Sequence, residues 1–406
     1  MYKIVNKQYE LNINFLICIL LFLDPVFDNI TGFMLLNGYT SNFSSILKSF
    51  ILFMCILQIL MNRRCNIKNI KLILFGLFLM AINFMFTYLY FDEGYIYNFN
   101  ITIRLLNLFV LCMYFSTFKQ FNTQILMNYY SWFYPLSLLV PTALGIGYHT
   151  YKYDQIGYKG FYYAGNEISI IMIIIVAYSL NRVIYNKNKV NRINLALNII
   201  CSILIGTKAI ILACIVISIA YWLRTIKKRN IPENIFKLLV VFVLLFVIAI
   251  CFRSYIDSLI SIWQVRFARL GNKWFDFFLS ARNIKLREAF DVIKNENKLL
   301  ILLGSGAYFI TVKNGITIEM DFFDLLSYYG CLIAIFLSVH IIHFIYEIKR
   351  YISIIQYSVI VCVFLIGFLA GHVLFAPAVS TVLAVYVYDA LKGEKLGYRE
   401  INTDVR

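Results

Sequence analysis

Basic residues stand beside apolar runs at a few places in this sequence, where a charge is costly and its retention favours a function. Lys208 lies in GTKAIILA, at the turn between two apolar runs, and Arg282 lies in SARNIKLREAF, within a long polar stretch. Lysine and arginine bind phosphate groups through charge-assisted hydrogen bonds, so both residues are candidates for anion binding. The alternatives are a lysine that extends to the membrane surface and an arginine on a solvated helix face.

Carboxylates gather in the segment TIEMDFFD, where a later apolar run begins. This segment contains Glu319, Asp321 and Asp324. A carboxylate held between membrane and water can serve as a general base, whereas a carboxylate at a helix start commonly caps the helix. Because side chains two residues apart on a helix diverge by about 200°, we expect only one of Glu319 and Asp321 to face a site. Glu319 has the longer side chain and is the preferred base, and Asp321 is then expected to cap the helix.

The segment 147–166, GYHTYKYDQIGYKGFYYAGN, is rich in tyrosine and glycine. Tyrosine rings pack against the C–H faces of sugar rings, so this composition indicates a glycan-binding loop. Together with the cations, it favours a ligand that carries a sugar, a diphosphate and a lipid tail. The candidate substrate-binding residues are Tyr158, Lys159, Tyr162, Tyr163 and Asn166, with Arg266 from the long polar stretch.

The composition places these residues in a membrane protein. The chain has 406 residues, of which 61% are hydrophobic and only 14% are charged, and its mean hydropathy is +0.76. A soluble domain carries about 25% charged residues, so soluble enzymes and disordered chains are disfavoured. The net charge of +16 is explained by basic loops between apolar runs, which argues against nucleic-acid binding.

Apolar runs of about 20 residues predict an all-α polytopic bundle of about twelve transmembrane helices. In the first run, which contains Pro25, the carboxylates Asp24 and Asp28 either line a polar cavity or pair with Arg104. The predicted spans are 11–33, 44–62, 71–90, 101–118, 125–146, 167–184, 192–207, 208–225, 236–253, 322–346, 353–374 and 376–391.

The distribution of basic residues predicts that both termini are cytoplasmic. With that orientation, inner segments hold 22 of the 37 Lys and Arg residues, and short outer connections hold 5. The predicted units are spans one to nine (1–253), an extracytoplasmic loop domain (254–321), spans ten to twelve (322–391) and a cytoplasmic tail (392–406). We expect the loop domain to be mostly helical, because Ile260, Trp263, Phe267 and Leu270 recur at helical spacing and Ser280 is placed to cap a second helix.

Motifs for metals and nucleotides are absent from the sequence. There is no CxxC among the nine cysteines, no HExxH and no phosphate-binding glycine loop. His340 and His343 lie three residues apart near a predicted helix end, where histidines at the membrane interface are favoured over a metal site. We therefore expect neither a metal nor a cofactor.

The order of these parts resembles the O-antigen polymerase and O-antigen ligase superfamily. The resemblance rests on GFYYAGNEIS before the sixth span, IGTKAIILA at the seventh-to-eighth turn, SARNIKLREAF followed by LLGSG, and then EMDFFDLLSYYG and GFLAGHVLFAP. It also rests on the long outer loop between the ninth and tenth spans. It implies a membrane glycosyltransferase of the bacterial cytoplasmic (inner) membrane that acts on undecaprenyl-diphosphate-linked oligosaccharides.

Ligases of the superfamily carry a basic residue at the seventh-to-eighth turn, an arginine in the long loop and a histidine before the tenth span. Lys208 and Arg282 match the first two positions in kind, whereas Glu319 stands at the third. This departure favours a polymerase that joins repeat units into O-antigen or capsular polysaccharide on the outer face. The resemblance implies that Arg282, Lys208 and Lys159 neutralise the diphosphate while Glu319 or Asp321 accepts the proton.

Two alternatives stay open from the sequence. One is an O-antigen ligase, and the other, from a different class, is a lipid-linked oligosaccharide flippase. A flippase is expected to place cations at several depths of the bundle, but the predicted spans hold almost none apart from Arg104. The expected partners are the lipid bilayer and the lipid-linked oligosaccharide, with a chain-length regulator and a flippase as candidate protein partners.

Overall fold

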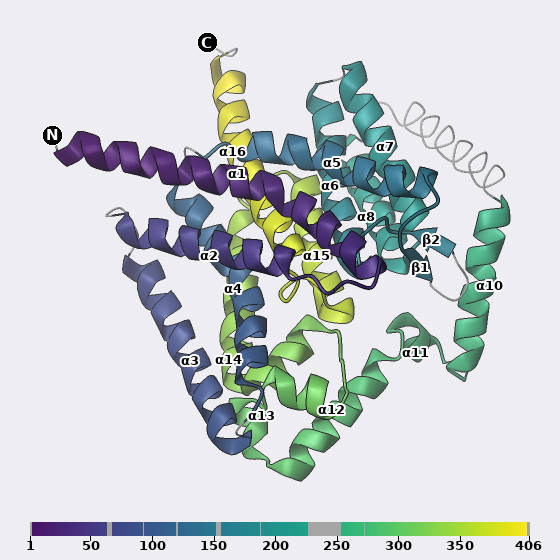
Figure 1. Ribbon diagram of the computed structural model, residues 1–406. Coiled ribbons are helices and arrows are strands. Elements are labelled where there is room, and N and C mark those ends of the chain that lie inside the picture. The colour runs from purple at the N-terminus through teal and green to yellow at the C-terminus, as the bar shows by residue number, and fades with distance from the viewer. Residues whose placement is uncertain are drawn as a thin grey trace.

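Helices dominate the computed structural model, which describes residues 2–62, 67–91, 93–118, 121–151, 156–186, 188–225, 253–271 and 273–403 (Figure 1). The helices that coincide with predicted spans are α1 (Tyr2–Leu36), α2 (Phe43–Met61), α3 (Ile67–Phe91), α4 (Tyr95–Thr117), α5 (Thr123–Ala143), α6 (Gly165–Tyr185), α7 (Lys189–Ile205), α8 (Lys208–Thr225), α14 (Asp321–Ile348), α15 (Ile354–Ala370) and α16 (Pro377–Thr403).

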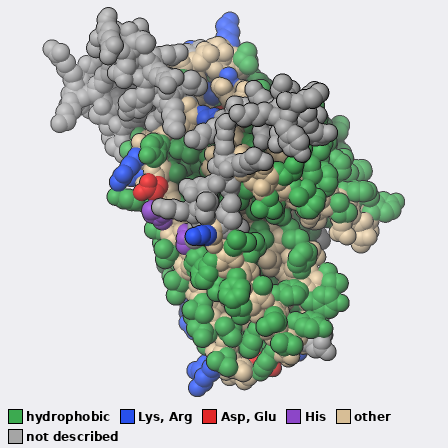
Figure 2. All heavy atoms as spheres, turned by 90° about the vertical axis from the view of Figure 1, so that its left-hand side faces the viewer, with side chains coloured by type: hydrophobic (Ala, Val, Ile, Leu, Met, Phe, Trp, Pro, Cys, Tyr) green, Lys and Arg blue, Asp and Glu red, His purple; other side chains and the backbone are tan. Residues whose placement is uncertain are grey.

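Six of these helices, in the described part of the chain, are long and apolar enough to cross a membrane: α1, α2, α3, α4, α6 and α14. The chain is therefore a polytopic membrane protein with an all-α fold. The predicted ninth span, 236–253, lies outside the described residues except for its last residue, so the total of twelve spans stays a prediction. Figure 2 shows hydrophobic side chains over most of the described surface on one face, as contact with lipid requires.

The proline inside α1 is accommodated by neighbouring side chains. Pro25 has no N–H and cannot bond the carbonyl of Leu21. The Tyr130 hydroxyl, from α5, donates to that carbonyl at 2.9 Å, and Asn29 donates to the Pro25 carbonyl at 2.8 Å. Because the one carbonyl that the proline leaves without its helical partner is satisfied by Tyr130, α1 continues through the proline, as a spanning helix must.

The long segment 254–321 is mostly helical, as predicted. It contains α10 (Arg253–Arg269), α11 (Trp274–Phe278), α12 (Arg282–Glu296), α13 (Leu299–Leu303) and the π-helix η1 (Phe309–Lys313). The prediction that Ser280 caps the second helix is wrong, because Ala281 occupies the N-cap with a left-handed backbone and makes no side-chain cap bond. The C-terminal end of α13 rests in a kink of α14 at Gly330, where a Cβ atom would lie 2.2 Å from the Leu302 carbonyl oxygen.

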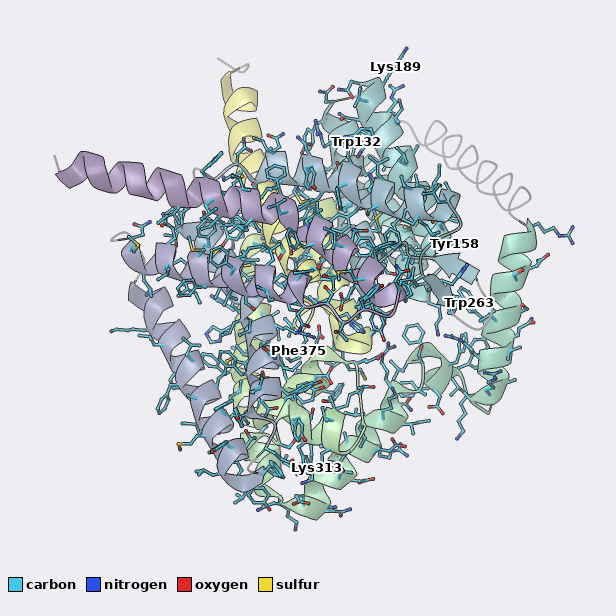
Figure 3. The ribbon with its side chains drawn as sticks, in the orientation of Figure 1. Trp132, Tyr158, Lys189, Trp263, Lys313 and Phe375 are labelled. Carbon is cyan, nitrogen blue, oxygen red and sulfur yellow. The ribbon has the colours of Figure 1, made fainter. Side chains whose placement is uncertain are left out.

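The tyrosine-rich segment contributes a small antiparallel hairpin, which the sequence did not predict. Its strands are β1 (His149–Tyr151) and β2 (Ile156–Tyr158). Tyr151 is buried against Ile262 and Trp263 of α10, and Figure 3 shows Tyr158 and Trp263 on the same side of the molecule. The two segments that were predicted to be outside therefore meet each other.

Candidate active site

An ion pair joins the two residues that the sequence singled out most strongly. The Arg282 guanidinium lies 3.0 Å from the Glu319 carboxylate. Arg282 is the first residue of α12, and its side chain is only 11% exposed, whereas Glu319 precedes α14 and is 41% exposed. A guanidinium has five N–H donors. Within the described residues, Arg282 uses them only toward Glu319 and, at 3.5 Å, the Leu279 carbonyl, so N–H groups remain for a second anion.

Strained backbone surrounds this ion pair. Among the described residues, four other than glycine have a positive φ: Ser280, Ala281, Glu319 and His372. The first two directly precede Arg282, the third is its ion-pair partner, and the fourth follows Gly371, whose Cβ would lie 2.7 Å from the backbone of Glu319. Such conformations cost about 1–3 kcal/mol each and concentrate at functional sites. Their convergence on one ion pair marks it as the candidate active site.

Lys208 lies between the charge fields of Arg282 and a third cation, Arg266. Lys208, at the start of α8, donates to the Phe277 carbonyl at 2.8 Å, and its ammonium lies 4.1 Å from the centre of the Phe277 ring. Lys208 senses the positive charges of both Arg266 and Arg282. Arg266, on α10, stacks over the ring of Tyr151 at 4.6 Å. Three basic residues from distant parts of the sequence thus converge, which is the arrangement that binds a diphosphate.

Asp321 does not cap α14, contrary to the prediction. Its buried carboxylate instead accepts hydrogen bonds from the N–H groups of Val373 and Leu374, at 2.9 Å each. The N-cap of α14 is Met320, which has no side-chain cap bond. Asp321 therefore fixes the α15–α16 linker, residues 371–376, against the start of α14.

His372, in that linker, is a site residue that the sequence analysis missed. Its Nδ1 atom lies 3.7 Å from the Glu167 carboxylate at the start of α6. Burial acts to lower the pKa of His372, but the negative charges of Glu167, Glu319 and Asp321 outweigh it and raise that pKa. The imidazolium form is therefore favoured. The available signal was a histidine beside a glycine in the break between two spans, in GFLAGHVLFAP.

A buried polar network links α1 and α2. Asp28 accepts hydrogen bonds from Ser44 and Lys48, and Lys48 also lies 3.6 Å from Asp24. Of the two possibilities for these aspartates, pairing with Arg104 is wrong, because Lys48 is their partner and the Arg104 side chain is exposed. The lysine neutralises carboxylates that would be costly in the bundle interior.

The five predicted sugar-binding residues of the tyrosine-rich segment have different surroundings. Tyr163 is 72% exposed, whereas Tyr162 is 7% exposed and bonds Asn29 and Ser137. Lys159 donates to the Tyr163 carbonyl at 2.5 Å and faces the rings of Tyr148 and Tyr163, and burial lowers its pKa. Tyr158 pairs with the His149 ring, and Asn166 is half-buried.

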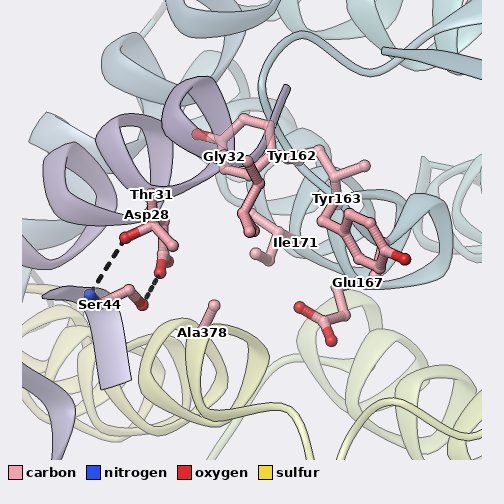
Figure 4. Close-up of a pocket in the computed structure, with 12 residues that line it drawn as sticks. Asp28, Thr31, Gly32, Ser44, Tyr162, Tyr163, Glu167, Ile171 and Ala378 are labelled. Atoms are coloured by element: carbon pink, nitrogen blue, oxygen red, sulfur yellow. Dashed lines mark hydrogen bonds between the residues drawn. The ribbon is translucent and has the colours of Figure 1, made fainter. Parts of the chain in front are cut away.

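A cavity of about 150 Å³ lies between α1, α2, the start of α6 and α16 (Figure 4). Figure 4 shows Asp28 and Ser44 on one side of it and Tyr163 and Glu167 on the other. The lining residues are Asp28, Thr31, Gly32, Leu35, Ser44, Tyr162, Tyr163, Ala164, Glu167, Ile168, Ile171 and Ala378.

Metal ligation finds no support in the described part of the chain, where no group of three His, Cys, Asp or Glu side chains is placed to hold an ion. His340 instead contacts the carbonyl of Phe336 at 2.7 Å through Nδ1.

The comparison with known families identifies the family of the chain. A family model described as O-antigen ligase like membrane protein matches residues 10–258, which is more than half of the chain. The chain belongs to this O-antigen ligase-like membrane protein family. Members are membrane enzymes that transfer glycans in lipid-linked polysaccharide assembly. No curated protein and no solved structure matches the chain. Lys208 and Glu167 lie within the matched range, whereas Arg282, Glu319 and His372 follow it.

Proposed function

We propose that this family member is a polysaccharide polymerase, which joins undecaprenyl-diphosphate-linked repeat units into O-antigen or capsular polysaccharide. The observation that carries the proposal is the Arg282–Glu319 ion pair, set among two further cations and strained backbone. An anion site beside a carboxylate is what glycosyl transfer from a diphosphate needs, because the leaving group gains charge while the attacking hydroxyl loses a proton.

The reaction breaks the bond between the anomeric carbon of the growing chain and its diphosphate. A hydroxyl oxygen of the acceptor repeat unit forms the new bond to that carbon, and undecaprenyl diphosphate leaves. Arg282, Lys208 and Arg266 neutralise the leaving diphosphate, and Glu319 accepts the hydroxyl proton. Lys159 and the tyrosines of the hairpin segment are proposed to bind the sugars.

The ion pair gives this mechanism an order of events. Glu319 is a weak base while it is bound to Arg282, because the neighbouring cation favours the ionised carboxylate. A diphosphate carries more negative charge than one carboxylate and competes for the guanidinium. We propose that donor binding draws Arg282 away from Glu319 and thereby makes Glu319 available for the proton.

The proposed location is the outer face of the bacterial cytoplasmic membrane, with a chain-length regulator and a flippase as protein partners. The contact of Tyr151, from the hairpin segment, with Ile262 and Arg266, from the 254–321 segment, supports this location, because both segments are predicted to be outside. Cysteine labelling of intact cells at position 275 and at position 227 tests the orientation. We expect labelling at 275 only, and equal labelling at both would refute the proposed side.

One observation favours an O-antigen ligase as the second candidate. His372 follows Gly371, which packs against the backbone of Glu319, and it senses the charge of Glu319, so a histidine is present near the site although it is absent from the TIEMD stretch. The surface glycan of a deletion strain separates the candidates. Single repeat units on the anchor indicate a polymerase, absence of transfer to the anchor indicates a ligase, and cytoplasmic accumulation of the lipid-linked unit indicates a flippase.

A further inference from the structure

None of the three cations lines the cavity between α1, α2, α6 and α16, but side chains connect the cavity to Glu319. Glu167 lines the cavity and also faces His372 at 3.7 Å. His372 in turn senses the charge of Glu319, and its neighbour Gly371 abuts the Glu319 backbone. Glu167 and His372 therefore link a group bound in the cavity to the candidate active site.

The lining decides which chemistry fits. Two carboxylates, Asp28 and Glu167, face the cavity, and hydroxyl groups come from Thr31 and Ser44. Carboxylates that are already paired with Lys48 and His372 offer no positive charge to a phosphate and are poor partners for a lipid tail, but their oxygens accept strong hydrogen bonds from hydroxyl groups. The apolar part of the wall includes Ile171. This mixture of hydroxyl-binding groups and apolar wall suits a neutral, hydroxyl-rich ring.

Two features argue against a bound cation. The Lys48 ammonium already lies within bonding distance of Asp28 and Ser44 and 3.6 Å from Asp24. In addition, no three metal-ligating side chains come together in the part of the chain that is described. The volume of about 150 Å³ matches that of an engineered protein cavity of about 150 Å³ that binds benzene, so a single six-membered sugar ring fits.

We propose that this cavity is the subsite for one sugar of the acceptor repeat unit, with Glu167 accepting a hydrogen bond from a sugar hydroxyl. The proposal rests on the proposed glycan transfer and adds where the acceptor binds. His372 holds the Glu167 carboxylate in place, so the acceptor ring is held in a fixed position relative to the Arg282–Glu319 pair. The diphosphate of the donor stays with the cations.

Two neighbouring leucines at the end of α1 provide a matched test. Leu35 lines the cavity and is 39% exposed, whereas Leu36 is 37% exposed and does not line it. Leu35→Trp is expected to obstruct the cavity, and Leu36→Trp is the control with the same added bulk. Because both side chains are already well exposed, neither tryptophan has to enter a packed core.

The assay uses the full-length protein in nanodiscs and lipid-linked repeat units extracted from cells that lack it. We expect Leu35→Trp to raise the KM for dimer formation at least tenfold and Leu36→Trp to keep the wild-type value. Glu167→Gln keeps the shape but loses a charge-assisted hydrogen bond, so KM is expected to rise about ten- to hundredfold. Wild-type KM values in both Leu35→Trp and Glu167→Gln would overturn the proposal.

A binding measurement separates this proposal from the polymerase activity. The same repeat units should raise the melting temperature of the wild-type protein, because a ligand that binds the folded state stabilises it. We expect this shift to become smaller in Leu35→Trp, where only the donor position at the cations can still bind a repeat unit, and to keep its full size in Leu36→Trp, even if the wild-type protein forms no dimers and the polymerase assignment fails. No shift in the wild type, or an equal shift in all three proteins, would overturn the subsite.

Discussion

Replacement of Glu319 by glutamine tests the mechanism at its centre. Glu319→Gln keeps the size and hydrogen-bonding capacity of the side chain but cannot accept a proton, and it also removes the charge that faces Arg282 at 3.0 Å. If Glu319 is the general base, polymerisation is expected to fall about 10²–10⁴-fold. Single lipid-linked repeat units should accumulate while the amount of protein in the membrane stays normal.

The loss of the ion pair alone predicts a much smaller effect. Coulomb's law gives about 1.4 kcal/mol at this distance in a dielectric of about 80 and about 5.5 kcal/mol in a dielectric of about 20. Because the Glu319 side chain is 41% exposed, solvent screening places the interaction toward the lower value, at about 1–2 kcal/mol. That range corresponds to a change of about five- to thirtyfold. The size of the decrease in rate therefore distinguishes a general base from a residue that only pairs with Arg282.

The assay measures initial rates of dimer formation by purified protein, with and without the substitution, between pH 5 and pH 9. The ion pair of Glu93 with Lys313, at 3.7 Å and about half exposed on both sides, supplies the control. Glu93→Gln is expected to keep the wild-type rate. A decrease of less than about thirtyfold in Glu319→Gln, with an unchanged pH profile, would refute Glu319 as the base and leave it as the partner of Arg282.

Three further predictions follow from the same site. Lys208→Ala should reduce the rate of polymerisation about 10²–10³-fold with protein still in the membrane, whereas long-chain glycan at the normal level would remove this lysine from the site. Gly371→Ala places a side chain at a positive φ of 68° and adds a Cβ clash, so the free energy of unfolding, measured by thermal denaturation, should fall by about 1–3 kcal/mol. Gly315→Ala is the control, because Gly315 has a similar φ but open space around it, so the free energy of unfolding should fall less. Equal decreases in the two variants would contradict the clash at Gly371. The raised pKa of His372 stabilises the folded protein below its ordinary pKa of about 6.5, and this contribution is lost as the pH rises through the folded-state value. His372→Asn should therefore make the melting temperature less dependent on pH above 6.5, and an unchanged dependence would contradict the ion pair with Glu167.

Several elements could be predicted from the sequence because they depend on local composition. The helices α2, α6 and α14 were placed within a few residues, since an apolar run of about 20 residues has few alternatives to a spanning helix. Lys208 and Arg282 were singled out because a charge beside an apolar run is costly. The helical content of 254–321 followed from the spacing of its apolar residues.

Other features were decided only by the tertiary structure. Arg282 and Glu319 are 37 residues apart, and their ion pair depends on how the start of α12 approaches the start of α14. Asp321 was expected to cap its own helix, but the unpaired N–H groups of the α15–α16 linker lie beside it and bind its carboxylate instead. His372 approaches Glu167 through the same linker.

The reason is physical. Hydrophobic transfer acts on each run of sequence by itself, so the amino-acid sequence determines which segments become helices and which charges stand at their ends. Hydrogen bonds and ion pairs act over a few ångströms, so their partners are settled only when distant segments pack together. The left-handed backbone at Glu319 and His372 is held by that packing, because neither residue adopts it readily by itself.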